Sequence, residues 1–141
     1  MGLYITILDA NGQELDDRES DNIFQMGGGI IELYEEGMIK YGMAFESGFD
    51  EDALADWNEQ LLFAEAPDAS DETGIPTYKM SSSNWNVTRG EITRALAAWE
   101  RNKPTDPAQW PLADETDNGE LWMRWLAFLF RSAQYGGFNV S

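Results

Sequence analysis

The amino-acid sequence predicts an α+β fold with a majority of helix, in which about four helices surround a central C-terminal helix and a small β-hairpin lies at the N-terminus. Three observations lead to this fold class. Residues 120–135 are dense in large apolar side chains, helical spacing of apolar residues recurs in earlier segments, and residues 3–8 form a strand-like run before an Asn-Gly turn. We expect a single domain over residues 1–141, since this length buries about two thirds of the unfolded surface.

The N-terminal hairpin is predicted from Leu3 to Leu8, an apolar run rich in β-branched residues. The dipeptide Asn11-Gly12 follows, and it favours a tight hairpin turn. A short return strand would cover Gln13 to Leu15. The next segment, Asp16 to Asn22, carries five charged residues in seven positions, so we expect it to form a loop.

A first helix is predicted after the triplet Gly27-Gly28-Gly29, because apolar residues recur at helical spacing over residues 30–45. Its other side carries glutamates: Glu32, Glu35, Glu36 and Glu46. Gly37 and Gly42 inside this segment each cost up to about 1 kcal/mol relative to alanine, so a split or a change to strand after Gly37 is an alternative. The triplet lacks the Gly-Lys-Ser/Thr ending of a phosphate-binding loop, which leaves it as a hinge or a close-approach turn.

A second helix is predicted over Glu51 to Glu65, because Asp50 can cap it and acidic residues in its first turn suit the helix dipole. Its apolar stripe comprises Leu54, Trp57, Leu61 and Ala64. The opposite side carries what we call the acidic ridge: Asp52, Asp56, Glu59 and Phe63. The ridge is our candidate partner-binding site, and a solvated helix face with one exposed phenylalanine is the alternative, since single exposed hydrophobic residues are ordinary.

The chain between the second and third helices is predicted to contain a loop and two short strands. The loop covers Ala66 to Pro76, a stretch rich in Pro, Asp, Ser and Gly. Tyr78 to Met80 and Trp85 to Val87 are the expected strands, joined by the polar turn Ser81 to Asn84.

A third helix is predicted to begin at Thr88, because Thr88 and Glu91 have the spacing of a capping box. Its core face comprises Ile92, Leu96 and Trp99. We expect it to end near Asn102, before Pro104, and to be followed by a long linker, Lys103 to Asn118, on the surface. The linker contains three prolines, and its apolar anchors are Trp110 and Leu112.

The central helix is predicted over Glu120 to Tyr135, which contains two tryptophans, two phenylalanines and three leucines. Its polar residues form one narrow stripe: Glu120, Arg124, Arg131 and Gln134. A helix that is apolar on its remaining faces has neighbours on most sides. Asp117 and Glu120 fit a capping box at its start, and Gly136-Gly137 should end it.

The second half of the chain also contains a series of short motifs: Tyr78-Lys79, Ser83-Asn84, Trp85, Val87-Thr88, Glu91, Trp122, Trp125-Leu126, Phe128-Leu129 and Gly136-Gly137-Phe138-Asn139-Val140. In these motifs the chain resembles small uncharacterised proteins of actinobacteria and their phages. The resemblance covers about the second half of the chain, and the family implies no activity and no functional residues.

The net charge of −17, from 26 acidic and 9 basic residues, limits the possible partners. Direct binding to nucleic acid is disfavoured because it requires a basic footprint, and anionic membranes are disfavoured for the same reason. Such a field attracts a basic protein surface, which could belong to a toxin or to a nucleic-acid-binding groove. An acidic coat that serves only solubility is an equal alternative. No segment has the pattern of a signal peptide or a membrane span, so we expect a cytoplasmic protein.

The chain contains neither cysteine nor histidine, which excludes thiol nucleophiles, Ser-His-Asp triads and zinc or iron sites built on these residues. Carboxylate pairs remain as candidates for acid–base chemistry or magnesium binding: Asp16-Asp17, Asp50-Glu51-Asp52, Asp71-Glu72 and Asp114-Glu115. In each pair the residues are adjacent, so their side chains diverge in a helix or a strand. We therefore expect no enzymatic activity, no cofactor and no metal site.

These observations favour a non-enzymatic acidic protein that occupies a basic surface of a partner. The sharpest form of this hypothesis is a phage-type DNA mimic that inhibits a host defence nuclease, such as a restriction or CRISPR effector. One alternative is an immunity or antitoxin protein that neutralises a basic toxin. Another is a phage or cytosolic structural subunit in which the acidity is incidental, and the oligomeric state is left open. A magnesium-dependent enzyme is the least favoured.

Overall fold

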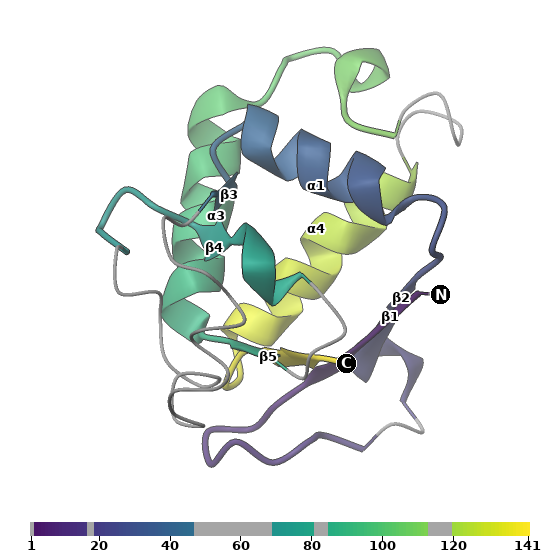
Figure 1. The fold of residues 1–141 in the computed structure, drawn as a ribbon, viewed down its shortest axis with the longest axis vertical. Coiled ribbons are helices and arrows are strands. Elements are labelled where there is room, and N and C mark those ends of the chain that lie inside the picture. Colours follow the sequence, from purple (N-terminus) through teal and green to yellow (C-terminus); the bar gives the residue numbers. More distant parts are fainter. Residues whose placement is uncertain (1, 17–18, 47–68, 81–84, 113–119) are drawn as a thin grey trace.

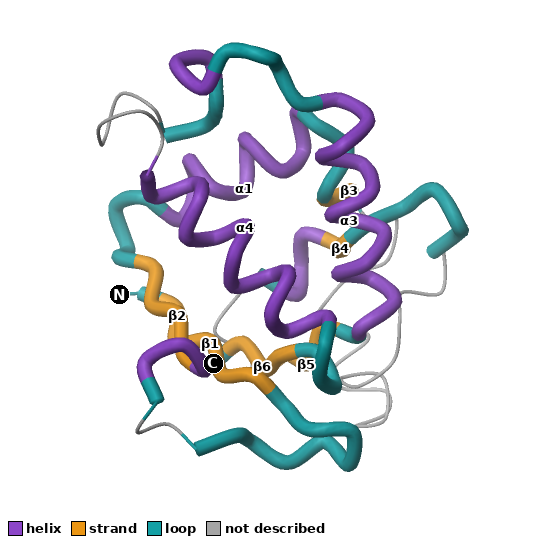
Figure 2. The backbone as a smooth tube through the Cα atoms, turned by 180° about the vertical axis from the view of Figure 1, so that it is seen from behind, coloured by secondary structure: helices purple, strands orange, loops and turns teal. Residues whose placement is uncertain are grey.

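The computed structural model describes residues 2–16, 19–46, 69–80, 85–112 and 120–141. In these residues, three α-helices lie on one side of a four-stranded sheet, as Figures 1 and 2 show from opposite directions. The hydrophobic core lies between the helices and the sheet.

The main sheet is antiparallel and has the order β2-β1-β6-β5. Its strands are β1 (Leu3–Ile7), β2 (Ile23–Met26), β5 (Trp85–Val87) and β6 (Phe138–Val140). The C-terminal strand β6 lies between β1 and β5, so the sheet joins the two halves of the chain. Gly137 permits this arrangement, because its φ is 92° and a Cβ there would lie 2.1 Å from the carbonyl oxygen of Val87.

This architecture corrects the predicted fold class. The sheet has four strands and is not a small hairpin, because β1 pairs with β2 and with β6. The predicted return strand, Gln13 to Leu15, forms only one isolated β-bridge, between Glu14 and Leu8, the residue directly after β1. The prediction of about four helices is also wrong: the described residues contain three α-helices. The helix predicted over Glu51 to Glu65 lies outside the described residues.

Helix α1 (Ile31–Lys40) ends before Gly42, whose φ of 78° lies in the left-handed region. A short strand β3 (Ala44–Phe45) follows and pairs in parallel with β4 (Ile75–Pro76). The predicted helical segment does change to strand, but only at Ala44, because α1 continues through Gly37 to Lys40. Gly37 is required by packing, because a Cβ there would lie 2.6 Å from the Cβ of Pro111 in the linker.

The predictions for residues 78–102 are partly confirmed. Tyr78 to Met80 is not a strand, since Thr77–Lys79 forms a 3-10 helix (η3), whereas the strand at Trp85–Val87 is present as β5. Helix α3 (Arg89–Asn102) begins with the predicted capping box: the Thr88 hydroxyl accepts from the Glu91 amide, and Glu91 Oε1 accepts from the Thr88 amide. It ends at Asn102, as expected.

Two further 3-10 helices complete the described chain. The first, η1 (Ser20–Asn22), precedes β2 in a segment that was predicted to be loop, and the second, η4 (Pro107–Gln109), lies in the linker. Both predicted anchors of the linker contact the core: Leu112 is buried, and the Trp110 ring packs edge-on against Trp99.

Helix α4 (Glu120–Ala133) is the predicted central helix, and it ends two residues before Tyr135. Trp122, Trp125 and Leu129 are fully buried, which confirms its place in the core. The expectation that only one narrow polar stripe of this helix faces solvent is wrong, because the apolar side chains of Met123 and Phe130 are 53% and 64% exposed. The predicted cap Asp117 lies outside the described residues.

Candidate functional surface

The acidic ridge predicted from the sequence lies outside the described residues: Asp52, Asp56, Glu59 and Phe63. Its geometry therefore stays a prediction. The functional surfaces that the structure does describe are defined by charge, by exposed apolar side chains and by two grooves beside α4.

Charge is distributed very unevenly along the chain. Residues 1–78 contain 19 acidic and two basic residues, whereas residues 79–141 contain seven of each. The first part therefore carries the entire net charge of −17, and the second part is neutral. The overall composition conceals this asymmetry, which a count along the sequence would have found.

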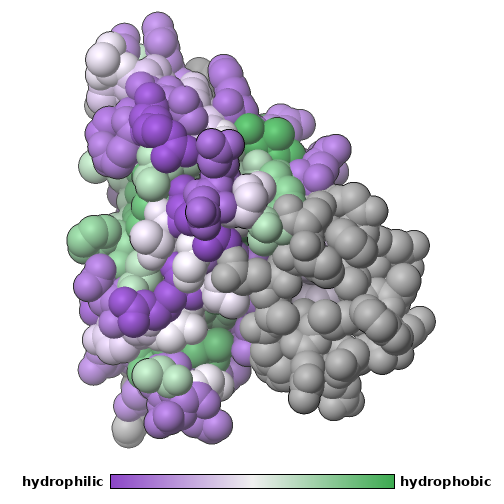
Figure 3. Space-filling model, turned by 90° about the vertical axis from the view of Figure 1, so that its left-hand side faces the viewer, coloured by the Kyte–Doolittle hydropathy of each residue, from purple (hydrophilic) through white to green (hydrophobic). Residues whose placement is uncertain are grey.

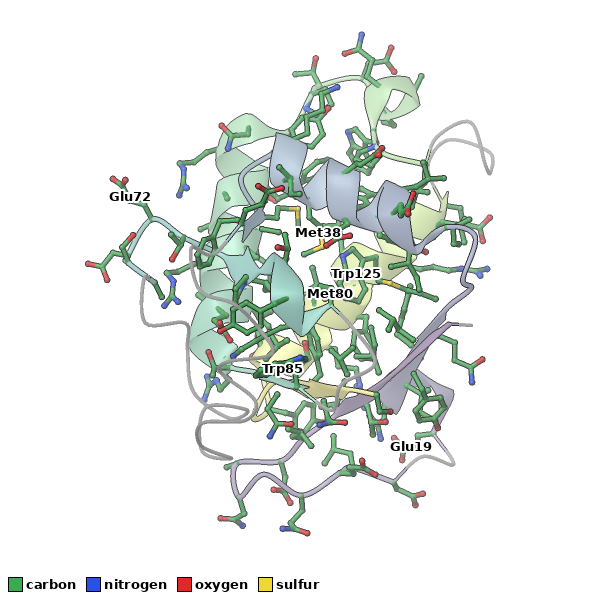
Figure 4. All side chains as sticks on the ribbon, in the orientation of Figure 1. Glu19, Met38, Glu72, Met80, Trp85 and Trp125 are labelled. Carbon is green, nitrogen blue, oxygen red and sulfur yellow. The ribbon has the colours of Figure 1, made fainter. Side chains whose placement is uncertain are left out.

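The fold converts part of this asymmetry into separate faces. Helix α1 of the acidic part lies toward the viewer in Figure 1, whereas α3 and α4 of the neutral part lie toward the viewer in Figure 2. Glu19 and Glu72, both from the acidic part, point outward from distant parts of the surface in Figure 4. In Figure 3, which views the α3 side, hydrophobic patches reach the surface between hydrophilic side chains.

The outward side of α1 forms a second acidic helix face, which we call the α1 face: Glu32, Leu33, Glu36 and Ile39. Glu32 and Glu36 are exposed one helical turn apart, and the two apolar side chains are 37% and 41% exposed. A hollow of about 340 Å³ adjoins this face, between Lys40 and the linker around Trp110. The α1 face thus combines spaced carboxylates with apolar contact area, the same chemistry that the acidic ridge was predicted to offer.

A larger groove of about 680 Å³ runs between α4 and the β2–α1 side of the molecule. Arg124 and Arg131 lie along it, and both contact carboxylates or amides. Arg131 Nη2 donates to Asn22 Oδ1 at 2.8 Å and thereby ties α4 to η1, whereas Arg124 contacts Glu120 at 2.6 Å on the surface. The exposed Arg124–Glu120 pair contributes about 0–1 kcal/mol, whereas Asn22 is buried and its hydrogen bond from Arg131 holds η1 against α4.

Tyr34 lies at the floor of this groove, where its ring contacts Phe24, Trp122 and Trp125. Burial raises the pKa of the Tyr34 phenol above 10.0, and the nearby positive charge of Arg124 partly opposes this rise. The unfolded phenol titrates near 10.0, so its contribution to stability is complete below that pH and is lost as the pH rises from 10.0 through the raised pKa.

We therefore expect Tyr34 to ionise at higher pH than an ordinary tyrosine, and Arg124→Gln to raise its pKa further. The measurement is alkaline titration of tyrosinate absorbance, with Tyr34→Phe subtracted to isolate this one side chain. An unchanged Tyr34 midpoint in Arg124→Gln would contradict the assigned electrostatic contact.

The remaining titratable pair of interest, Lys79 and Glu91, is completely buried. Lys79 Nζ lies 2.8 Å from Glu91 Oε1 and donates to the carbonyl oxygen of Asn86 at the same distance. The pair joins η3, β5 and α3. Because both side chains are 0% exposed, no substrate reaches them, and their role is structural.

Within the described residues, no group of three or more acidic side chains is arranged to hold a metal ion. In the same part of the chain, none of the helices has the length and apolar character needed to cross a membrane. Comparison of the chain with protein-family models, with curated proteins and with solved structures finds no match.

Proposed function

We propose that this is a non-enzymatic cytoplasmic protein whose acidic surface occupies a basic surface of a partner protein, as a phage-type DNA mimic that inhibits a host defence nuclease. The observation that carries the proposal is the confinement of the whole net charge of −17 to residues 1–78. An acidic coat that only maintains solubility needs no such confinement. A concentration of acids in one part of the chain suits a protein that uses that part to contact a basic groove.

The α1 face supports this proposal in physical terms. Glu32 and Glu36 stand four residues apart on a rigid helix, which places their carboxylates about 6 Å apart along its axis. Spaced anionic groups on a rigid support suit lysine and arginine side chains that normally contact phosphates. Leu33 and Ile39 add apolar area beside the charges, as the rim and core of a protein interface require.

Binding to the partner should therefore depend on the acidic surfaces and weaken steeply with salt, because exposed charge pairs are screened within about 8–10 Å. Reversing the ridge to lysine at Asp52, Asp56 and Glu59 should abolish capture of the partner from host lysate. The equal-sized control is reversal of Asp16, Asp17 and Glu19, which should cost less.

A second pair of variants tests the α1 face. Glu32→Lys with Glu36→Lys should weaken binding by about tenfold or more, as two contacts of about 1 kcal/mol each are reversed. The matched control, Glu100→Lys with Glu120→Lys, changes two exposed acids of the neutral part and should leave affinity nearly unchanged. Equal losses in both pairs would mean that total charge, not a defined face, drives binding.

Competition with duplex DNA distinguishes a nuclease partner from a toxin partner. If the partner uses its nucleic-acid-binding groove, duplex DNA should displace the acidic protein, and the partner's nuclease activity should be inhibited in proportion to binding. A captured basic partner that binds equally well in saturating DNA would refute DNA mimicry and favour the immunity or antitoxin function.

A further inference from the structure

The α3/α4 groove is an apolar surface in the neutral part of the chain, on the opposite side of the molecule from the α1 face. It has a volume of about 390 Å³. The residues that line it include Arg89, Leu96, Ala97, Glu100, Phe130 and Ala133. We propose that a second copy of this chain docks on the α3/α4 groove, forming a two-fold symmetric dimer with Phe130 as its anchor.

Phe130 is 64% exposed and Met123 is 53% exposed, the largest values for bulky apolar side chains among the described residues. They lie seven residues apart on α4, which places both on the same side of the helix. Phe130 therefore projects beside a groove whose floor is formed by small and aliphatic side chains such as Ala97 and Leu96. Exposed aromatic side chains next to apolar grooves are typical anchors of protein interfaces.

A chain with a net charge of −17 repels another copy of itself, so two copies can approach only through a face that carries no excess of acid. Among the described residues, the charged side chains that line the groove are one arginine, Arg89, and one glutamate, Glu100. The groove is thus a place where a second copy of this acidic protein meets no excess of either charge. A basic partner is disfavoured there for the same reason.

Helices α3 and α4 run antiparallel, because Arg89 Nε donates to the Ala133 carbonyl oxygen at 3.0 Å and the Trp99 and Trp122 rings lie 5.5 Å apart at the other end. In the proposed dimer, the two-fold axis crosses the middle of the groove at right angles to the helices. Each residue then faces the residue of the second copy that lies at the same distance on the other side of the middle.

The residues that meet across this axis are complementary. Arg89 and Glu100 lie at opposite ends of the groove on α3, so each arginine faces the glutamate of the second copy. Met123 likewise faces Phe130 of the second copy. Glu100 already contacts Lys103, the residue directly after α3, at 3.0 Å, but this exposed pair is weak and leaves the carboxylate accessible to a second cation.

The test is light scattering after size exclusion, over a range of protein and salt concentrations. We expect the wild type to reach twice the mass of one chain as its concentration rises, and association to strengthen with salt because salt screens the repulsion between copies. Phe130→Asp should remain monomeric with an unchanged circular dichroism spectrum. The control Ile39→Asp, an equivalent change on the α1 face, should dimerise like the wild type.

Charge exchange makes the test specific to the proposed geometry. Glu100→Arg and Arg89→Glu should each weaken self-association by about tenfold or more, since each homodimer would contain two like-charge contacts. Mixing the two variants should restore a dimer of one copy of each, because both contacts are then of opposite charge. A wild type that stays monomeric, or a mixture that forms no mixed dimer, would overturn the proposal. Because binding to the basic partner weakens with salt while dimerisation strengthens, failure of either proposal leaves the other intact.

Discussion

Replacing Trp125 by alanine should destabilise the protein by about 3–5 kcal/mol, enough to unfold many single domains. The side chain is fully buried, and Figure 4 shows it between the helices and the sheet. Its ring contacts Phe24 of β2 at 5.1 Å, Tyr34 of α1 at 6.0 Å and Phe138 of β6 at 6.0 Å between centroids. Truncation therefore leaves a cavity where three different elements meet α4, and no one of them can close it alone.

The free energy of unfolding is measured by chemical denaturation followed by circular dichroism. The matched control is Phe130→Ala, an aromatic truncation on the same helix at a position that is 64% exposed. At a protein concentration where the wild type is monomeric, this control should change stability by less than about 0.5 kcal/mol. A melting temperature of Trp125→Ala within about 2 °C of the wild type would contradict the central position of this side chain.

The helices were predictable because their signals are local. The capping box at Thr88 and Glu91, the apolar density of residues 120–135 and the glycines after Tyr135 all act within a few residues of the element that they define. The same holds for the end of α1, where Gly42 follows with a φ of 78°. Where a structure is determined by neighbours in sequence, pattern and propensity are sufficient to locate it.

The sheet could not be predicted in the same way, because its strands are short and its pairs are distant. β6 has three residues and pairs with β1 from the other end of the chain, so nothing near residues 138–140 indicates that they form an interior strand. The Asn-Gly turn is present, yet the residues directly after it add only the bridge between Leu8 and Glu14, and Leu3 to Thr6 of β1 pair with Ile23–Met26. Tertiary packing decides these pairings.

Prediction of the exposed functional surfaces from the sequence meets the same limit. Phe128 and Phe130 lie two residues apart, which places them on opposite sides of α4; one is buried and the other is the most exposed aromatic side chain of the described residues. The positions of α3 and the sheet around α4 decide which of the two sides is covered. The charge asymmetry between residues 1–78 and 79–141, in contrast, is a property of the sequence and needed no structure to detect. What the structure adds is that α1 of the acidic part and α3 and α4 of the neutral part face opposite sides of the molecule.

Lys79 is the residue whose environment departs most from its sequence pattern, and it leads to the second large expected effect. Its ammonium group lies with Glu91 in the core at 2.8 Å, and both side chains are 0% exposed. Removing one partner of a buried ion pair leaves the other charge without compensation, which costs about 3–5 kcal/mol. We therefore expect Lys79→Met to destabilise the protein by this amount, although methionine fills a similar volume.

A double-mutant cycle assigns the effect to the pair. Glu91→Gln keeps an oxygen that can accept from the Thr88 amide, so it removes the charge and preserves the cap. The double variant should be less destabilised than the sum of the two single variants, because it leaves no unpaired buried charge. The surface pair supplies the control: Lys103→Met removes a contact of 3.0 Å to Glu100 and should cost less than about 1 kcal/mol. If urea denaturation gives Lys79→Met and Lys103→Met equal stability losses, burial does not strengthen the Lys79–Glu91 pair, and the core in this region is hydrated.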